Sequence, residues 1–203
     1  MVSMPASRPY HHGDLRSALL TAAERTLRDK GAAALSLREL ARDIGVSHAA
    51  PGRHFKDKQA LLDALALDGY DRLMQTLAAA DDPTLPLQPR LTGLTRAYLR
   101  FATDNAALLE LMYSLKHDPD ASGQMAAAAE RTVQSLAAIV AEAQQRGEII
   151  EGDPAVLTLT VGAALHGIAT FAANGHTDAQ AAVAGTEGVD ALVHLLLHGL
   201  LPR

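Results

Sequence analysis

The chain has 203 residues, of which 48% are hydrophobic, a net charge of −5 at neutral pH and no cysteine. This length suits two helical domains of ordinary size. Without cysteine the chain has no disulfide framework and no thiolate metal site, which fits a reducing cytosol. The first 13 residues, MVSMPASRPYHHG, lack the apolar stretch of a secretory signal, so we expect a short solvated arm there.

The charge is unevenly distributed along the chain. Residues 1–70 carry 10 Lys and Arg against 8 Asp and Glu, a net charge of +2, whereas residues 71–203 carry 8 against 15, a net charge of −7. This asymmetry favours a small nucleic-acid-reading module joined to an acidic helical body.

The first predicted helix runs from about Asp14 to Lys30 and ends at Gly31. Its apolar stripe consists of Leu15, Ala18, Leu19, Ala22, Ala23 and Leu27. We expect this stripe to complete a three-helix core with Leu37, Leu40, Ile44 and Phe55.

Residues 36–58, SLRELARDIGVSHAAPGRHFKDK, predict a helix, a sharp turn and a second helix. Ser36 and Glu39 have the spacing of a capping box. The apolar residues of the first helix follow at i, i+3, i+4 and i+7, namely Leu37, Leu40, Ala41 and Ile44. Gly45 suits the left-handed helix end, and Ser47 suits the next N-cap. This order is that of a helix-turn-helix, whose second helix enters the DNA major groove.

Basic side chains surround one aromatic residue at the end of this segment. Phe55 can anchor the core while the neighbouring Arg53, His54, Lys56 and Lys58 face phosphate. Asp57 can cap a further helix that starts there. Because short helical hairpins are common, these residues alone leave a solvated charged face as the alternative.

Residues from about Asp14 to Leu65 resemble the N-terminal DNA-binding domain of the TetR family of transcriptional regulators. The matching stretches are ALLTAAERTLRDKGAAALSLRELARDIGVS and RHFKDKQALLDAL. The resemblance implies an all-α fold of about nine helices. It places an arm and a helix-turn-helix domain in residues 1–60 and a ligand-binding and dimerisation domain in residues 61–203. It further implies that the helix starting near Asp57 sets the spacing of two recognition helices by its tilt.

The predicted recognition helix departs from the family pattern at one position. Family members commonly have a tyrosine two residues before the histidine, where this chain has Gly52 after Pro51. Both residues disfavour a helix interior, so we expect a short helix that is partly ordered by DNA. We expect His48, Ala49 and Ala50 to read bases, since alanine can contact a thymine methyl group. The expected phosphate contacts are Ser36, Arg38, Ser47, Arg53, His54, Lys56 and Lys58, with a merely exposed charge as an equal alternative for Arg38.

Three prolines between Asp81 and Pro89 predict a loop. Helical spacing resumes in RLTGLTRAYLRFATDN and AALLELMYSL, and a long alanine-rich helix follows over residues 124–147. The 24 residues from Pro154 to Thr177 carry no charge, which is long enough to raise the question of a membrane span. Their threonines, their glycines and the lack of basic or aromatic flanks favour a soluble helix buried on most sides, and we expect no membrane association.

The last predicted helix, from about Glu187 to Leu201, is apolar around more than one face. Together with the uncharged segment before it, this helix predicts a homodimer interface. The TetR resemblance implies the same, because the family dimerises through a four-helix bundle of its last two long helices. Two copies of a helix-turn-helix can read a palindromic operator in double-stranded DNA.

The stretch LHGIATFAANG, residues 165–175, is similar to the WHG-type C-terminal domain of some TetR-like regulators, although this chain has no tryptophan. The resemblance implies a repressor that leaves its operator when a small-molecule inducer, of unidentified class, enters this domain. The candidate pocket residues are Phe101, Leu108, Met112, Tyr113, His117, His166 and Phe171. The alternative for each is ordinary core, and His166 is the best candidate because a buried histidine needs a partner.

Other functions find little support in the motifs. The sequence has no Gly-rich phosphate loop, H-E-x-x-H or G-x-S-x-G, so we expect no catalytic residue and no cofactor. His194 and His198 have a spacing that can share a metal, but we favour surface or interface histidines and expect no metal site. The sequence therefore predicts a cytoplasmic, dimeric DNA-binding transcriptional regulator. A ligand-binding helical dimer with weak or lost DNA binding is the alternative, and Gly52 keeps it open.

Overall fold

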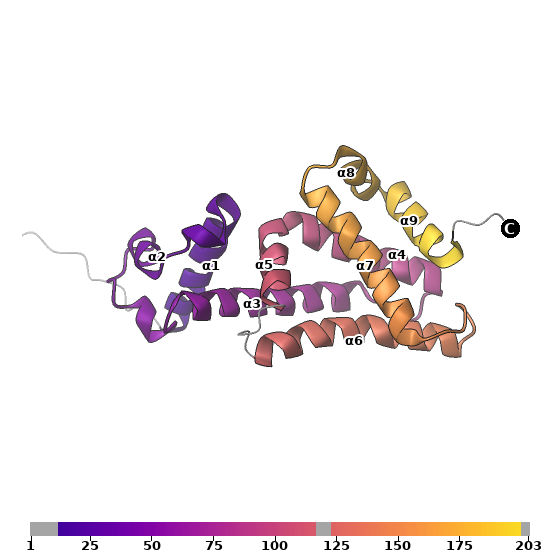
Figure 1. Cartoon of the computed structure of the whole chain (residues 1–203), viewed down its shortest axis with the longest axis horizontal. Helices are drawn as coiled ribbons and strands as arrows, with labels where there is room; N and C mark the ends of the chain where they lie inside the picture. Colours follow the sequence, from indigo (N-terminus) through magenta and orange to yellow (C-terminus); the bar gives the residue numbers. More distant parts are fainter. Residues whose placement is uncertain (1–11, 117–122, 200–203) are drawn as a thin grey trace, which may run out of the picture. The chain divides into compact units, whose positions relative to one another are not determined.

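A computed structural model of the chain describes residues 12–116 and 123–199. Within these two ranges the protein consists of nine α-helices and two short 3-10 helices, with no strand, which confirms the predicted all-α fold (Figure 1). Residues 1–11 of the predicted N-terminal arm and His117 lie outside the described residues, whereas the last two residues of that arm, His12 and Gly13, begin α1. The chain divides into two compact units between Leu65 and Ala66.

The first unit is built on α1 (His12–Lys30) and α2 (Leu37–Asp43), with the 3-10 helices η1 (Ala32–Ala34) and η2 (Pro51–Arg53) between the longer elements. The beginning of α3 (Lys58–Ala80) completes it. Its buried core comprises Leu19, Ala22, Ala23, Leu27, Leu35, Leu40, Ala41, Phe55, Leu61, Leu62 and Leu65. Most of the predicted stripe is therefore buried, whereas Leu15, Ala18, Leu37 and Ile44 are half-buried at its edge.

The turns and helix caps predicted for the first unit are confirmed in part. Gly45 has a φ of +73°, the left-handed conformation that was predicted at the end of α2. Asp57 caps α3 as predicted, because its Oδ1 accepts a hydrogen bond of 2.8 Å from the N–H of Ala60. The predicted capping box is absent: Ser36 is extended, with φ −144°, and makes no side-chain cap hydrogen bond to the start of α2.

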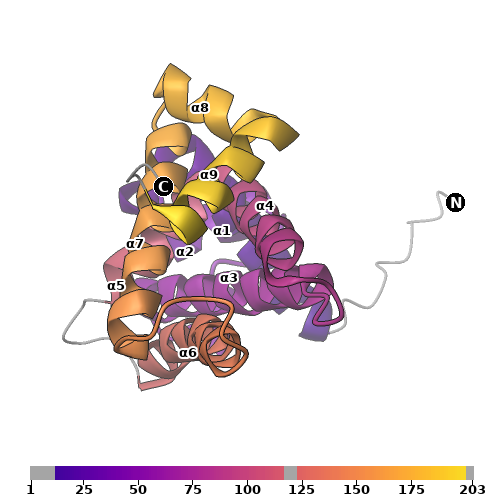
Figure 2. The ribbon, with the colours of Figure 1, turned by 90° about the vertical axis from the view of Figure 1, so that its right-hand side faces the viewer.

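The second unit contains the rest of α3 and six further helices. These are α4 (Leu87–Asp104), α5 (Ala106–Lys116), α6 (Gly123–Gln145), α7 (Pro154–Ala173), α8 (Thr177–Ala184) and α9 (Thr186–His198). Helix α4 is central, because α5, α7, α8 and α9 all contact it. Helix α6 contacts α5 and α7 and runs beside the C-terminal half of α3 in both views (Figures 1 and 2). The sequence did not reveal α8, and α4 begins inside the predicted loop because Pro89 is tolerated in a first helical turn.

Helix α3 approaches α5 closely at Gly69. A Cβ atom at this position would lie 2.7 Å from the Sδ of Met112 and 3.2 Å from the Cγ of Leu108, so only glycine fits without a shift. One residue later, the Tyr70 hydroxyl donates a hydrogen bond of 3.3 Å to the Met112 carbonyl. Arg72 then donates a hydrogen bond of 2.6 Å to the Oδ1 of Asn105. These contacts hold the second half of α3 against α5.

Helix α7 differs from the prediction of a helix buried on most sides. Its residues Val156, Leu159 and Phe171 are 57%, 71% and 57% exposed. By length and composition alone α7 could cross a membrane, with a mean hydropathy of 1.7, but one such helix is weak evidence because soluble proteins contain similar ones. The uncharged sequence of α7 therefore forms an apolar face that the described residues leave uncovered.

Candidate functional site

The recognition segment, residues 47–54, folds as consecutive tight turns and contains no α-helix. An α-type bond of 2.9 Å from the N–H of Phe55 to the Pro51 carbonyl closes its end. The N–H of Ala50 donates to the Ser47 carbonyl at 3.0 Å, that of Arg53 to Ala50 at 3.2 Å, and that of His54 to Pro51 at 2.9 Å. These i to i−3 bonds are those of a 3-10 helix, and η2 covers only Pro51–Arg53. The predicted short recognition helix is thus a single 3-10 turn, because Pro51 has no N–H and Gly52 weakens a helix.

Most of the predicted DNA contacts lie on the surface of the first unit. Ser47, His48, Ala49, Arg53, Arg38 and Lys56 are exposed, whereas Ala50, Ser36, His54 and Lys58 are half-buried. Pro51, which directly follows Ala50, is buried and anchors the segment to the core. The segment therefore presents small, polar and basic side chains to solvent.

Two of the half-buried candidates have structural surroundings of their own. The ammonium of Lys58 donates a hydrogen bond of 2.9 Å to the carbonyl of Ala33, which ties α3 to η1. The Nε2 of His54 is buried and has no hydrogen-bond partner among the described residues. Arg16, which the sequence analysis did not single out, places its guanidinium 5.6 Å from the centroid of the Phe55 ring.

The second unit contains a partly open cavity of about 1020 Å³ between its helices. Apolar side chains of every long helix of this unit form its walls, including Leu77 of α3, Leu91 and Leu94 of α4, Leu136, Ile139 and Val140 of α6, Leu157, Val161 and Leu165 of α7, and Val193, Leu196 and Leu197 of α9. A volume of this size and an apolar lining with few polar groups are typical of small-molecule binding sites.

Three polar aromatic side chains, the Tyr98–Tyr113–His166 cluster, line one part of the cavity. The Tyr98 hydroxyl lies 3.0 Å from the Nδ1 of His166, and the Tyr113 ring stacks on the imidazole at 3.7 Å between centroids and 17° between planes. Burial raises the pKa of both tyrosines, so both phenols are neutral at physiological pH. The cluster joins α4, α5 and α7.

The predicted pocket residues fall into different places. Tyr113 and His166 line the cavity, whereas Phe101, Leu108 and Met112 are buried in the core and do not line it. Met112 instead packs against Gly69, and Phe171 is 57% exposed. His117 lies outside the described residues.

Several polar residues of the cavity wall were not predicted, namely Thr95, Tyr98, Glu130, Thr132, Gln134, Ser135, Thr158 and His198. Tyr98 follows Leu91 and Leu94 along the inner face of α4, so its helical spacing was the available signal. Thr158 is 5% exposed, and its Oγ1 has no hydrogen-bond partner among the described residues. No sequence pattern distinguishes it from the other threonines of α7.

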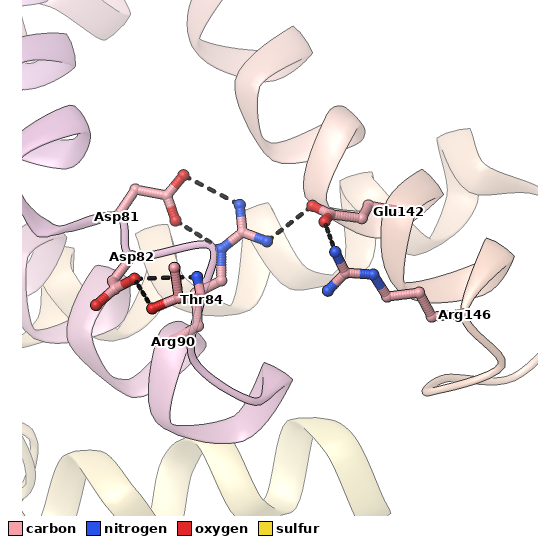
Figure 3. A network of polar contacts seen from close by, with 6 residues as sticks. All are labelled: Asp81, Asp82, Thr84, Arg90, Glu142 and Arg146. Carbon is pink, nitrogen blue, oxygen red and sulfur yellow. Dashed lines mark hydrogen bonds and ion pairs between the residues drawn. The ribbon is translucent and has the colours of Figure 1, made fainter.

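A network of charged side chains connects α4 and α6 to the residue that follows α3 (Figure 3). Arg90 is buried, with 7% of its side chain exposed, and donates to Asp81 through Nε and to Glu142 through Nη1 at 2.6 and 2.7 Å. Glu142 also accepts a hydrogen bond of 2.6 Å from the more exposed Arg146. The hydrogen bond from Arg90 lowers the pKa of the Glu142 carboxyl. The two carboxylates of Asp81 and Glu142 are balanced by the two guanidinium groups of Arg90 and Arg146.

The histidines of α9 stand close together. The rings of His194 and His198 have centroids 4.3 Å apart with planes tilted by 55°. Within the described ranges, no three His, Cys, Asp or Glu side chains converge in a way that could hold a metal ion.

Comparison with known families decides the identity of both units. Residues 19–65 match the family described as bacterial regulatory proteins, tetR family, and residues 91–199 match the tetracyclin repressor-like C-terminal domain. The chain belongs to the TetR family. It is a transcriptional regulator with a DNA-binding helix-turn-helix in its first unit, as the sequence resemblance implied.

Individual relatives agree with this family. The HTH-type transcriptional regulator Rv1816 of Mycobacterium tuberculosis is 35% identical over 91 residues, which are 44% of this chain and 39% of the relative. The match thus spans less than half the length of that curated relative. A solved protein of unknown function from Rhodococcus sp. RHA1 is 42% identical, covers 97% of this chain and 100% of its own, and has a TM-score of 0.84. FadR of Bacillus subtilis, solved with stearoyl-CoA, shares the fold at a TM-score of 0.75 and 17% identity, over 91% and 99% of the two chains.

Proposed function

We propose that this TetR-family regulator is a cytoplasmic homodimeric repressor that binds a palindromic operator and is released by a small molecule in the cavity. The observation that carries the proposal is the cavity of about 1020 Å³ in a chain that also holds a helix-turn-helix. The protein acts by binding, without a catalytic residue or cofactor of its own.

On the DNA side, the exposed Arg38, Arg53 and Lys56 contact phosphates, while His48 and Ala49 reach base edges. Ser36, Ser47, His54 and Lys58 add backbone contacts, and Ala50 adds an apolar contact. Because the recognition segment forms tight turns and a 3-10 helix in place of an α-helix, DNA must order it further, which reduces affinity by the ordering cost. The alternative, a ligand-binding dimer with weak DNA binding, rests on this same observation.

The second copy of the chain covers the uncovered apolar residues of α7 and α9. Leu159 of α7 is 71% exposed and Leu195 of α9 is 46% exposed, in helices that both contact α4. Burying such side chains stabilises a dimer in proportion to the apolar area removed from water. Dimerisation also matches the reading of two half-sites, which a single small helix-turn-helix cannot achieve.

Ligand binding is coupled to DNA binding through α3. Leu77 of α3 lines the cavity directly, and Asp81 just after the helix is bound to Arg90 of α4. Helix α3 is continuous from Lys58 to Ala80, so a ligand that displaces Leu77 shifts one end of the helix that begins in the first unit. FadR of Bacillus subtilis, which shares this fold, was solved with stearoyl-CoA, so the fold can hold an apolar ligand.

The proposal is tested by binding of the purified protein to the DNA upstream of its own gene, compared with scrambled DNA near physiological salt. We expect clear preference for the upstream fragment, with two protomers per site. Weak, salt-sensitive binding that is equal for both fragments would support the alternative function. The Gly52→Ala variant sharpens the test: no atom lies within 4 Å of an added Cβ there, and alanine should favour the helix and strengthen operator binding about two- to fivefold.

A further inference from the structure

We propose that the cavity selects an uncharged, mainly apolar molecule with a hydrogen-bonding oxygen, such as a long-chain alcohol, and disfavours carboxylates and CoA thioesters. The oxygen meets the Tyr98–Tyr113–His166 cluster, and the apolar body fills the space between α4, α6, α7 and α9. This inference rests on the proposed ligand-binding role of the cavity and names the chemistry of its ligand.

The walls of the cavity contain no permanent cation, although the imidazoles of His166 and His198 line it. Among the described lining residues there is no Lys or Arg, and the one acidic residue is Glu130, which is exposed at the rim. A carboxylate buried without a cation loses its hydration without compensation, which makes burial of the charged form unfavourable.

Arg90 lies in the same helix as the lining residues Leu91 and Leu94, but its positive charge does not serve an anion in the cavity. Its guanidinium is occupied by Asp81 and Glu142, and with Arg146 on Glu142 the charges of the four side chains cancel. At longer range, residues 71–203 have a net charge of −7, which repels anionic ligands. The local network therefore gives an anion no attraction, and the distant charge repels it.

The polar part of the cavity matches a neutral oxygen. A phenol can donate one hydrogen bond and accept two, and burial keeps Tyr98 and Tyr113 in this neutral form by raising their pKa. The Tyr98 hydroxyl already lies 3.0 Å from the imidazole of His166, so a ligand hydroxyl can join an existing hydrogen-bond network. A neutral donor or acceptor can join such a network without any charged group losing its hydration.

Thr158 also belongs to the wall of the cavity. Its side chain is 5% exposed, and its Oγ1 is fully buried and has no hydrogen-bond partner among the described residues. Because this oxygen is closed off from the open space, a ligand cannot reach it without a rearrangement of the wall. The Tyr98–Tyr113–His166 cluster is therefore the hydrogen-bonding point of the proposal.

The test uses the full-length protein and displacement of Nile red, an uncharged apolar dye, by three compounds with the same chain length. We expect decan-1-ol to displace the dye at a concentration at least about tenfold lower than decanoate or decanoyl-CoA, the factor that corresponds to about 1.4 kcal/mol. Displacement by decanoate or decanoyl-CoA at an equal or lower concentration overturns the proposal.

Two tyrosine variants locate the contact. Tyr98→Phe should weaken decan-1-ol about fivefold, the effect of one neutral hydrogen bond, while Nile red itself binds unchanged. Tyr70→Phe is the matched control, because this buried hydroxyl donates to the Met112 carbonyl and does not line the cavity. Equal losses of alcohol binding in both variants, or no loss in Tyr98→Phe, contradict the assignment.

Parallel measurement of binding to the upstream DNA separates this inference from the proposed function. Selective alcohol binding that leaves DNA binding unchanged supports the chemistry of the cavity and contradicts release by a ligand. Release of DNA by decanoate or decanoyl-CoA, with the alcohol bound more weakly, supports the proposed function and overturns the inference.

Discussion

The guanidinium of Arg90 makes two parallel hydrogen bonds to the carboxylate of Asp81, 2.6 Å from Nε to Oδ1 and 3.1 Å from Nη2 to Oδ2. Asp81 directly follows the last residue of α3, so this bidentate pair fixes the end of that helix against α4. The third nitrogen reaches Glu142 at 2.7 Å and adds α6 to the same junction (Figure 3). Three helix segments that border the cavity thus meet at one side chain.

Arg90→Met should destabilise the protein by about 2 kcal/mol, because Asp81 and Glu142 lose their shared cation while both remain partly exposed to water. A change of this size lowers the melting temperature of a chain of this length by roughly 4 to 8 °C. Arg146→Ala is the control: it removes an exposed pair to the same carboxylate and should cost less than about 1 kcal/mol. Equal shifts in the two variants would show that burial of Arg90 has no special effect.

The stabilising effect of Glu142 should depend on pH. The hydrogen bond from Arg90 places the pKa of Glu142 in the folded chain below its ordinary value, so folding favours the ionised carboxylate. This stability is fully present above the unfolded pKa of about 4.3 and is lost as the pH falls through the lower folded pKa. The difference in melting temperature between the native chain and Glu142→Gln should therefore be constant near neutrality and shrink below about pH 4.

Glu130→Gln provides the comparison for this pH series. Glu130 lies on the exposed side of the same helix and accepts a hydrogen bond of 3.2 Å from the neutral Gln134. Its effect on the melting temperature should be small at every pH. A Glu142→Gln difference that grows in acid would contradict the sign of the pKa shift.

Gly69→Ala should lower stability by about 1 to 3 kcal/mol, because the added methyl group overlaps Met112 and Leu108 at the contact of α3 with α5. Gly93→Ala is a matched change in the interior of α4, where the nearest atom to a new Cβ is a carbonyl oxygen at 3.5 Å. That substitution should raise stability by about 0.5 to 1 kcal/mol. Thermal or urea unfolding of both variants checks the opposite signs.

Thr158→Val should raise the stability of the ligand-free protein by about 1 kcal/mol, because it removes a buried hydroxyl without a partner and keeps the side-chain shape. Thr132 also lines the cavity, but its hydroxyl donates to the Ala128 carbonyl at 3.3 Å. Thr132→Val should therefore leave stability unchanged or lower it. If Thr158→Val lowers the melting temperature, the hydroxyl has a stabilising partner in the free protein.

Leu159→Glu should convert the proposed dimer to monomers in sedimentation velocity, because it puts a charge into the most exposed apolar position of α7. Leu85→Glu, at a 41% exposed position between α3 and α4, controls for the loss of a surface leucine. A Leu159→Glu variant that remains a dimer at the same concentration would place the interface elsewhere.

The sequence by itself determined the features that depend on neighbours along the chain. The turn at Gly45, the cap at Asp57 and the weak helix around Pro51 and Gly52 follow from backbone preferences of single residues, so they are visible before any fold is known. The same holds for the helical periodicity, which identifies α-helices because each repeats its apolar face within a few residues. The capping box at Ser36 is the exception, since its pattern is present and its side-chain bond is absent.

The tertiary structure alone decided the cavity. Tyr98 and His166 are 68 residues apart in the chain, and their contact depends on how α4 and α7 pack. Packing also placed Met112 against Gly69 and left Leu159 exposed, although a sequence pattern does not distinguish these three residues from other apolar or small residues of their helices. Periodicity states that a side chain faces inward, but the volume and shape of all its neighbours decide whether it meets a core or an open space.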